Sequence, residues 1–177
     1  RALQERLGDG APLPAFVAGH SLGEYTALVA AGSIDLATGL RLVRRRGELM
    51  QAAAEATPSG MAALIGLTYD AALAACEGTG AQVANANSEQ QVVIAGPSAA
   101  LERAIEAAKA AGARRALPLD VAGAFHTEAM RPAQDEMDRE AHLMPDFRDT
   151  PQAEDPPTRV ATTFEALGYR ALTHGQK

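Results

Sequence analysis

The clearest chemical signal in the sequence is the segment GHSLG at residues 19–23, which has the form G-x-S-x-G. An apolar run at residues 15–18 predicts a buried strand before it, and residues 22–31 predict a helix after it. A serine held between small neighbours in a strained strand-to-helix turn is a nucleophile elbow. The new helix would direct its positive end and the N–H of Leu22 at the reacting oxygen. The pattern therefore predicts Ser21 as a nucleophile, the alternative being an ordinary tight turn with incidental glycines.

A serine nucleophile needs a general base, and the sequence offers several histidines. His126 lies in the segment GAFHT, a loop position that can face the elbow. His20 is adjacent to the serine, so a packing or hydrogen-bonding role is expected for it, and His142 and His174 fall in a tail where we expect them to be solvated. His126 is therefore the candidate base, and the alternative is a structural histidine.

An arginine run at residues 41–46 lies on a second predicted helix, residues 35–56, for which Asp35 is the expected N-cap. On a helical wheel, one arc of roughly 120° is apolar and predicts the buried face; it holds Leu42, Val43, Leu49, Met50 and Ala53. Arg46 falls near the middle of this arc. The other arginines of the run fall on the solvated side: Arg41, Arg44 and Arg45. Arg46 therefore either binds a substrate carboxylate or forms a structural salt bridge with an internal carboxylate.

Composition excludes several classes of protein. The chain has 177 residues with 16 basic and 22 acidic side chains, a net charge of -6, which argues against a nucleic-acid binder. No apolar run approaches the ~18 residues of a membrane span, and no signal peptide is recognised. Cys76 is the only cysteine, so neither an internal disulfide nor a cysteine-based metal site is expected. These features predict a soluble cytoplasmic protein.

The elements that must position these residues follow a regular order, which predicts an α/β fold. Between a break at residues 57–60 and residue 121, strands alternate with alanine-rich helices in the order β-α-β-β-α-β, a ferredoxin-like arrangement. The expected strands are 61–67, 81–86, 91–95 and 114–121, and the helices between them are capped by Asp70 and Ser98. We expect three segments: 1–59 with the elbow, 60–122 as an inserted subdomain, and 123–177 as the return to the large domain. The last segment ends in a proline-rich tail with no strand and one short helix at 163–172.

Several segments together resemble one enzyme family: GHSLGEYTALVAAGSIDL, LVRRRGELMQ, PSGMAALIGL, ANANSEQQVVIAGP and VAGAFHTEAMRPA. It is the malonyl-CoA:acyl carrier protein transacylase family, which also includes acyltransferase domains of polyketide synthases. The resemblance covers residues 1 to about 140. It implies an α/β-hydrolase-like large domain with a ferredoxin-like insert.

The resemblance assigns roles by position. Ser21 resembles the acylated nucleophile, His126 the base that activates it, and Arg46 the residue that binds the free carboxylate of the malonyl group. Leu22 resembles the residue that supplies an oxyanion N–H. A serine–histidine dyad is implied, with the histidine oriented by a backbone carbonyl. Leu22 and Phe125 resemble malonyl-selective members, because methylmalonyl-selective domains typically carry glutamine and serine there.

Two stretches depart from the family pattern. The family begins with a strand and a Gly-Gln-Gly-Ser-Gln loop whose glutamine supplies the second oxyanion donor, and the printed residues do not include such a stretch. After about residue 140 the tail does not resemble the strands and helices that complete the family's sheet. We therefore expect a truncated or frame-altered member with an incomplete large domain.

The expected activity is transfer of a malonyl group from coenzyme A to acyl carrier protein through an acyl-serine, in fatty acid or polyketide synthesis. Malonyl-CoA and acyl carrier protein are the expected partners. The phosphopantetheine arm belongs to the carrier protein, so no cofactor or metal of the chain's own is expected. A serine esterase or thioesterase of α/β-hydrolase type is one alternative, although neither Asp70 nor Asp120 lies in a recognisable triad motif. The other is a non-catalytic fragment of the transacylase.

Overall fold

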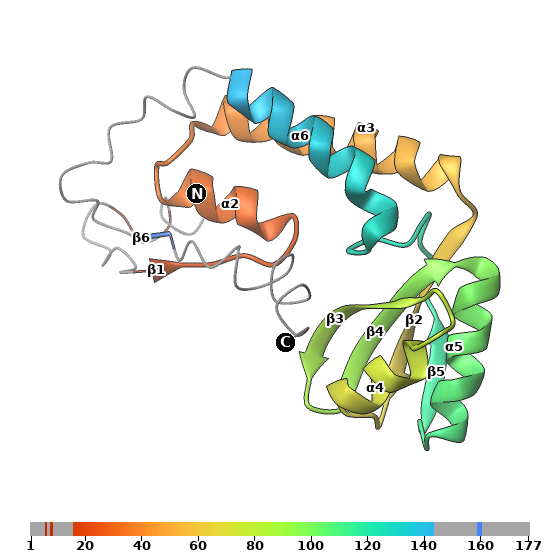
Figure 1. Cartoon of the computed structure of the whole chain (residues 1–177). Coiled ribbons are helices and arrows are strands. Elements are labelled where there is room, and N and C mark those ends of the chain that lie inside the picture. Colours follow the sequence, from red (N-terminus) through yellow and green to blue (C-terminus); the bar gives the residue numbers. More distant parts are fainter. Residues whose placement is uncertain (1–5, 7, 9–15, 144–158, 161–177) are drawn as a thin grey trace. The chain divides into compact units, whose positions relative to one another are not determined.

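The computed structural model describes residues 6, 8, 16–143 and 159–160 (Figure 1). The chain divides into two compact units, Arg1–Arg45 with Asp138–Lys177, and Arg46–Met137. Helices and strands are interspersed along the chain, so the fold is α/β as expected. None of the described helices has both the length and the apolar character needed to cross a membrane.

The first unit contains the strand, turn and helix that the sequence predicts around the serine. Strand β1 (Phe16–Val17) leads into the turn, and helix α2 (Gly23–Ala30) follows it. β1 pairs in parallel with β6 (Arg159–Val160). The expectation that the tail contributes no strand is therefore wrong, because β6 depends on a partner more than a hundred residues away and has no local signal of its own. The helix expected at 163–172 lies outside the described residues.

Helix α3 (Leu36–Ala56) begins at the N-cap that the sequence predicts. The carboxylate of Asp35 accepts a hydrogen bond from the N–H of Thr38 at 2.6 Å. The backbone and side-chain hydrogen bonds from Thr38 lower the pKa of Asp35, because they stabilise its charged form. A Cβ added at Gly39 would lie 2.6 Å from Cγ2 of Val29, so glycine there lets α3 lie close against α2.

The second unit holds an antiparallel sheet with two helices packed against it (Figure 1). Its elements are β2 (Ser59–Ile65), α4 (Tyr69–Cys76), β3 (Gln82–Ser88), β4 (Gln91–Pro97), α5 (Ser98–Ala110) and β5 (Arg115–Pro118). The strands lie in the order β3-β4-β2-β5, and each neighbouring pair is antiparallel. β5 is shorter than the strand expected at 114–121.

Both helix caps expected in this unit are wrong by one or two residues. Thr68 caps α4, since its backbone is extended and its hydroxyl accepts from the N–H of Ala71 at 3.3 Å, which leaves Asp70 inside the first turn. Ser98 is the first residue of α5 rather than its cap, and the preceding Pro97 makes no side-chain capping bond. The N–H of Ser98 instead donates to the carbonyl of the residue before β2, which ties the helix start to the sheet.

Alternate residues of β2 face opposite sides of the sheet. Ala62 and Leu64 are completely buried. A Cβ at Gly60, which has the same parity, would lie 3.5 Å from the side chain of Leu101 on α5. This side of β2 therefore packs against the helices.

The other side of the sheet is covered by the chain that follows β5. One buried cluster joins residues from three strands to a single residue beyond them: Met61, Ala63, Ala84, Val93, Ala95 and Ala124. Phe125 and Ala129 pack against this cluster. The short 3-10 helix η1 (Glu128–Met130) and helix α6 (Arg131–Leu143) follow, and the sequence pattern did not predict α6. The predicted base, His126, is thus part of a segment anchored on the sheet.

Candidate active site

Ser21 lies at the apex of a tight turn between β1 and α2. Its φ is 54°, in the left-handed region that side-chain-bearing residues rarely adopt. The turn is closed by a hydrogen bond from the N–H of Gly23 to the carbonyl of His20 at 3.0 Å, and the N–H of Glu24 donates to the carbonyl of Ser21 at 3.2 Å. Ser21 is half-buried and His20 is exposed. The strained serine in a strand-turn-helix unit is the local geometry of a nucleophile elbow.

The two glycines that flank the serine differ in what they permit. A Cβ at Gly19 would overlap the backbone carbonyl of Gly23, so residue 19 has no room for any side chain. At Gly23, no described atom outside the local helix backbone lies within 4 Å of an added Cβ. The small neighbours typical of a nucleophile elbow are therefore a steric requirement at residue 19 but not at residue 23.

Leu22 links the serine to α2 as the residue that precedes the helix. Its backbone is helical, and its carbonyl accepts from the N–H of Tyr25 at 3.2 Å. The N–H of Leu22 is not a donor in any backbone hydrogen bond of the described turn. Its side chain is 49% exposed. An N–H at the start of a helix, next to a serine, can stabilise a developing negative charge.

His126 has the same backbone peculiarity as the serine. Its φ is 62°, and its side chain is half-buried. The next residue, Thr127, is extended and caps η1 by accepting from the N–H of Ala129 at 3.3 Å. The hydroxyl of Thr127 also donates to the carbonyl of Ala124 at 2.7 Å, which closes the loop around His126. Nothing in the sequence around His126 indicates its left-handed backbone conformation. The Thr127 cap, by contrast, has a recognisable sequence signal, because threonine is a common residue immediately before a helix.

The helical wheel predicts Arg46 near the middle of the buried face of α3, and the structure agrees only in part. The apolar arc of α3 is its more buried side, where Leu42 is 2% exposed, and Arg46 is half-buried beside it. Arg45, expected on the solvated side, is only partly so: 37% of its side chain is exposed, and its Nε donates to Oε1 of Glu140 on α6 at 2.6 Å. Arg41 is exposed and donates to the hydroxyl of Thr38 at 2.7 Å. The wheel identifies the face of a residue but not a partner on another helix.

The four predicted site residues divide between the two units. Ser21 and Leu22 belong to the first, and Arg46 and His126 belong to the second.

Among the residues that the structure describes, no group of three or more His, Cys, Asp or Glu side chains is arranged to hold a metal ion.

Cys76 is a buried free thiol. Burial raises the pKa of Cys76 to about 11, because an apolar environment disfavours the thiolate.

A family model described as "Acyl transferase domain" matches residues 2–153. The chain belongs to the acyl transferase domain family. The Malonyl CoA-acyl carrier protein transacylase of Escherichia coli (strain K12) is 52% identical to this acyl transferase chain over 134 residues, 73% of the chain. The match covers 43% of that relative, so the chain spans less than half of its length.

Solved structures of two transacylases resemble the acyl transferase chain in fold and sequence. An acyl carrier protein S-malonyltransferase from Vibrio cholerae O1 biovar eltor matches with a TM-score of 0.74 and 43% identity, over 81% of this chain and 47% of that one. A malonyl-transacylase in complex with its type II PKS acyl-carrier protein matches with the same TM-score, identity and coverage.

Proposed function

We propose that this acyl transferase domain moves a malonyl group from coenzyme A to acyl carrier protein through an acyl-Ser21 intermediate. The observation that carries the proposal is the elbow, in which Ser21 has a φ of 54° and follows a glycine with no room for a side chain. The names of the similar proteins support the choice of malonyl group and carrier protein.

In the first half-reaction, His126 takes the proton of the Ser21 hydroxyl as its oxygen attacks the thioester carbonyl carbon of malonyl-CoA. The carbon–sulfur bond then breaks, and the proton goes from His126 to the departing coenzyme A thiolate. The N–H of Leu22 stabilises the transient oxyanion. The product is malonyl-Ser21.

In the second half-reaction, the phosphopantetheine thiol of acyl carrier protein attacks malonyl-Ser21 and loses its proton to His126. The serine oxygen leaves and recovers that proton, so the dyad is regenerated. The thiol belongs to the partner, and we propose no resident cofactor or metal for this chain. We also propose a location in the cytoplasm, which fits the use of a single cysteine, and the net charge of -6 argues against a nucleic-acid partner.

We propose that Arg46 selects the substrate by binding the free carboxylate of the malonyl group. A guanidinium can hold a carboxylate with two parallel hydrogen bonds, which a neutral acetyl group cannot receive. The half-buried position of Arg46 on the apolar side of α3 supports this role, because partial removal from water strengthens a charge-assisted contact.

We also propose that residues 60–122 form a ferredoxin-like insert in an α/β-hydrolase-like large domain, whose portions are 1–59 and 123–177. The sheet order β3-β4-β2-β5 supports it, because the first and third strands of the unit, β2 and β4, are central.

The test is the intact mass of the chain after incubation with malonyl-CoA, with Ser21→Ala as the matched control. One malonyl adduct that is absent from the variant, and that passes to added phosphopantetheinylated acyl carrier protein, is the expected result. Release of free malonate faster than transfer would instead favour a hydrolase. A folded sample that forms no adduct contradicts the proposal.

A further inference from the structure

We propose that Gln82 of β3 is a positioning residue for His126, an inference that rests on the proposed function for the role of that histidine. Positive φ is unfavourable for a residue with a side chain, so surrounding contacts must hold it. His126 has a φ of 62° within a loop that is closed by the hydrogen bond from the Thr127 hydroxyl to the carbonyl of Ala124. This loop is in turn fixed to the sheet by hydrogen bonds on both sides of the histidine.

Before the histidine, the loop is fixed by β2 and α3. The hydroxyl oxygen of Ser59 accepts from the N–H of Ala124 at 3.1 Å. A Cβ at Gly123 would lie 2.7 Å from Cβ of Ala54, so the chain passes close to α3 at this point. These contacts and the burial of Ala124 hold the loop two residues before His126.

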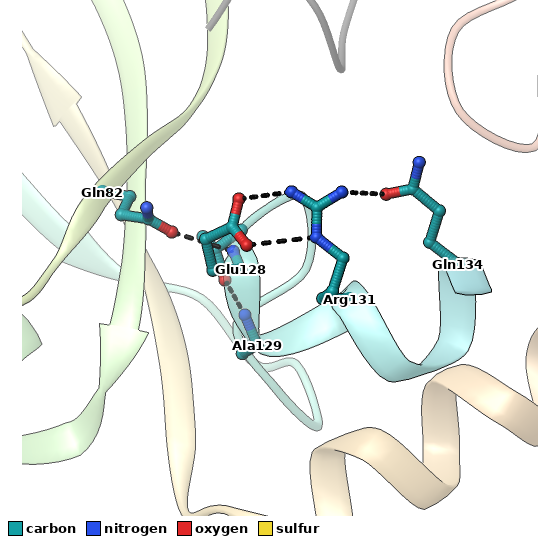
Figure 2. Close-up of polar contacts among 6 residues, drawn as sticks. Gln82, Glu128, Ala129, Arg131 and Gln134 are labelled. Carbon is teal, nitrogen blue, oxygen red and sulfur yellow. Dashed lines mark hydrogen bonds and ion pairs between the residues drawn. The ribbon is translucent and has the colours of Figure 1, made fainter. Parts of the chain in front are cut away.

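After the histidine, the loop is fixed by Gln82. Its side-chain carbonyl oxygen accepts from the N–H of Glu128 at 2.9 Å, across 46 positions in sequence. Figure 2 shows the Gln82 side chain directed from β3 at the backbone of Glu128. This hydrogen bond holds Glu128, two residues after His126, just as the Ser59 bond holds Ala124, two residues before it.

The neighbouring polar contacts do not replace this anchor, because they are local. Arg131 donates to both carboxylate oxygens of Glu128, at 2.8 and 3.2 Å, and lies 3.5 Å from the side-chain oxygen of Gln134 (Figure 2). These residues belong to η1 and the first turn of α6, so their bonds move with the segment. Arg131 also neutralises Glu128 beside Gln82, which makes a carboxylate at residue 82 tolerable.

The experiment compares Gln82→Met, which keeps the length but lacks the acceptor oxygen, with Gln82→Glu, which keeps the oxygen. Gln82 is exposed, so neither change removes core packing. Both are made in the wild-type chain and in His126→Ala. The readouts are hydrogen exchange of the Glu128 amide, kcat and KM for malonyl-enzyme formation, and the thermal midpoint.

We expect Gln82→Met to speed Glu128 exchange about 3- to 10-fold, as for one lost hydrogen bond. It should lower kcat about tenfold at unchanged KM, because a misplaced base slows proton transfer. Gln82→Glu should keep both the Glu128 exchange rate and kcat near their wild-type values. In the His126→Ala background, Gln82→Met should have no further effect on kcat.

Unchanged Glu128 exchange in Gln82→Met would overturn the inference whether or not the chain is active. An equal loss of kcat in the His126→Ala background, or a lowered thermal midpoint that accounts for the loss, would also overturn it by showing a merely structural role. If His126→Ala itself leaves kcat unchanged, it is the proposed base that fails, and the exchange result still decides whether Gln82 holds the loop.

Discussion

Ser21 and His126 share a left-handed backbone conformation, with φ values of 54° and 62°, that no other described non-glycine residue adopts. Such conformations cost free energy and persist only where the surrounding structure imposes them. Different contacts impose them here: a tight glycine-flanked turn at Ser21, and a loop tied to the sheet at His126. The two residues that the sequence predicts as nucleophile and base are therefore the two at which strain is localised.

Replacing Ser21 with glycine should stabilise the chain relative to replacing it with alanine. Glycine tolerates a positive φ, whereas alanine keeps the strain, so Ser21→Gly should exceed Ser21→Ala in free energy of unfolding by about 1 kcal/mol. Urea denaturation measures the difference, and both variants should lack the malonyl adduct.

Thr26 provides the control, because it is exposed in α2 and has ordinary helical geometry. There the order should reverse, with Thr26→Gly less stable than Thr26→Ala by about 1 kcal/mol. Equal stability of Ser21→Gly and Ser21→Ala would mean that the turn is not strained.

Sequence patterns predict those turns, caps and helix faces that are determined by residues close together in the chain. The strained turn at Ser21 and the cap at Asp35 follow from local spacing, and the structure has both. Arg46, predicted near the middle of a buried face, is only half-buried. The contacts that reach across the chain were not predictable in this way, because nothing beside Arg45 identifies Glu140 and nothing beside Gln82 identifies Glu128. The cap at Thr68 was missed because Asp70 offers an equally good local signal two residues later.

Gly19 and Gly23 should respond oppositely to alanine. Gly19→Ala would force a Cβ into the carbonyl of Gly23, so the turn must deform. We expect it to lower the free energy of unfolding by about 1–3 kcal/mol, as overpacking does, and to abolish the malonyl adduct. Gly23→Ala, placed in open space at the first position of α2, should leave urea stability unchanged or slightly higher. Similar losses in both variants would contradict the asymmetry of the elbow.

Arg46→Ala should remove the preference for malonyl over acetyl groups. A charge-assisted hydrogen bond contributes about 1.5–3 kcal/mol, so the ratio of kcat/KM for malonyl-CoA to that for acetyl-CoA should fall about 10- to 100-fold. Arg44→Ala is the control, since Arg44 is exposed on the same helix and should leave the ratio unchanged. An unchanged ratio in Arg46→Ala would contradict the proposed carboxylate contact.

Cys76 should be unreactive in the folded chain at pH 8. Burial raises its pKa from 9.0 to about 11, which lowers the thiolate fraction at this pH about a hundredfold. A chromogenic disulfide reagent should therefore label the native chain far more slowly than the same chain in urea. Equal labelling rates in the two conditions would show that the thiol is accessible.

The same pKa shift predicts a stability change in alkali. The folded state holds the Cys76 proton more tightly than the unfolded state does. The contribution of the protonated thiol to the free energy of unfolding is therefore complete below pH 9 and is lost as the pH rises towards about 11. The free energy of unfolding should therefore fall over this window, and it should fall less steeply in Cys76→Ala, which has no thiol to ionise. Urea denaturation of both chains at pH 8, 9, 10 and 11 measures the slopes. Identical slopes would mean that the Cys76 thiol ionises equally easily in the folded and unfolded states.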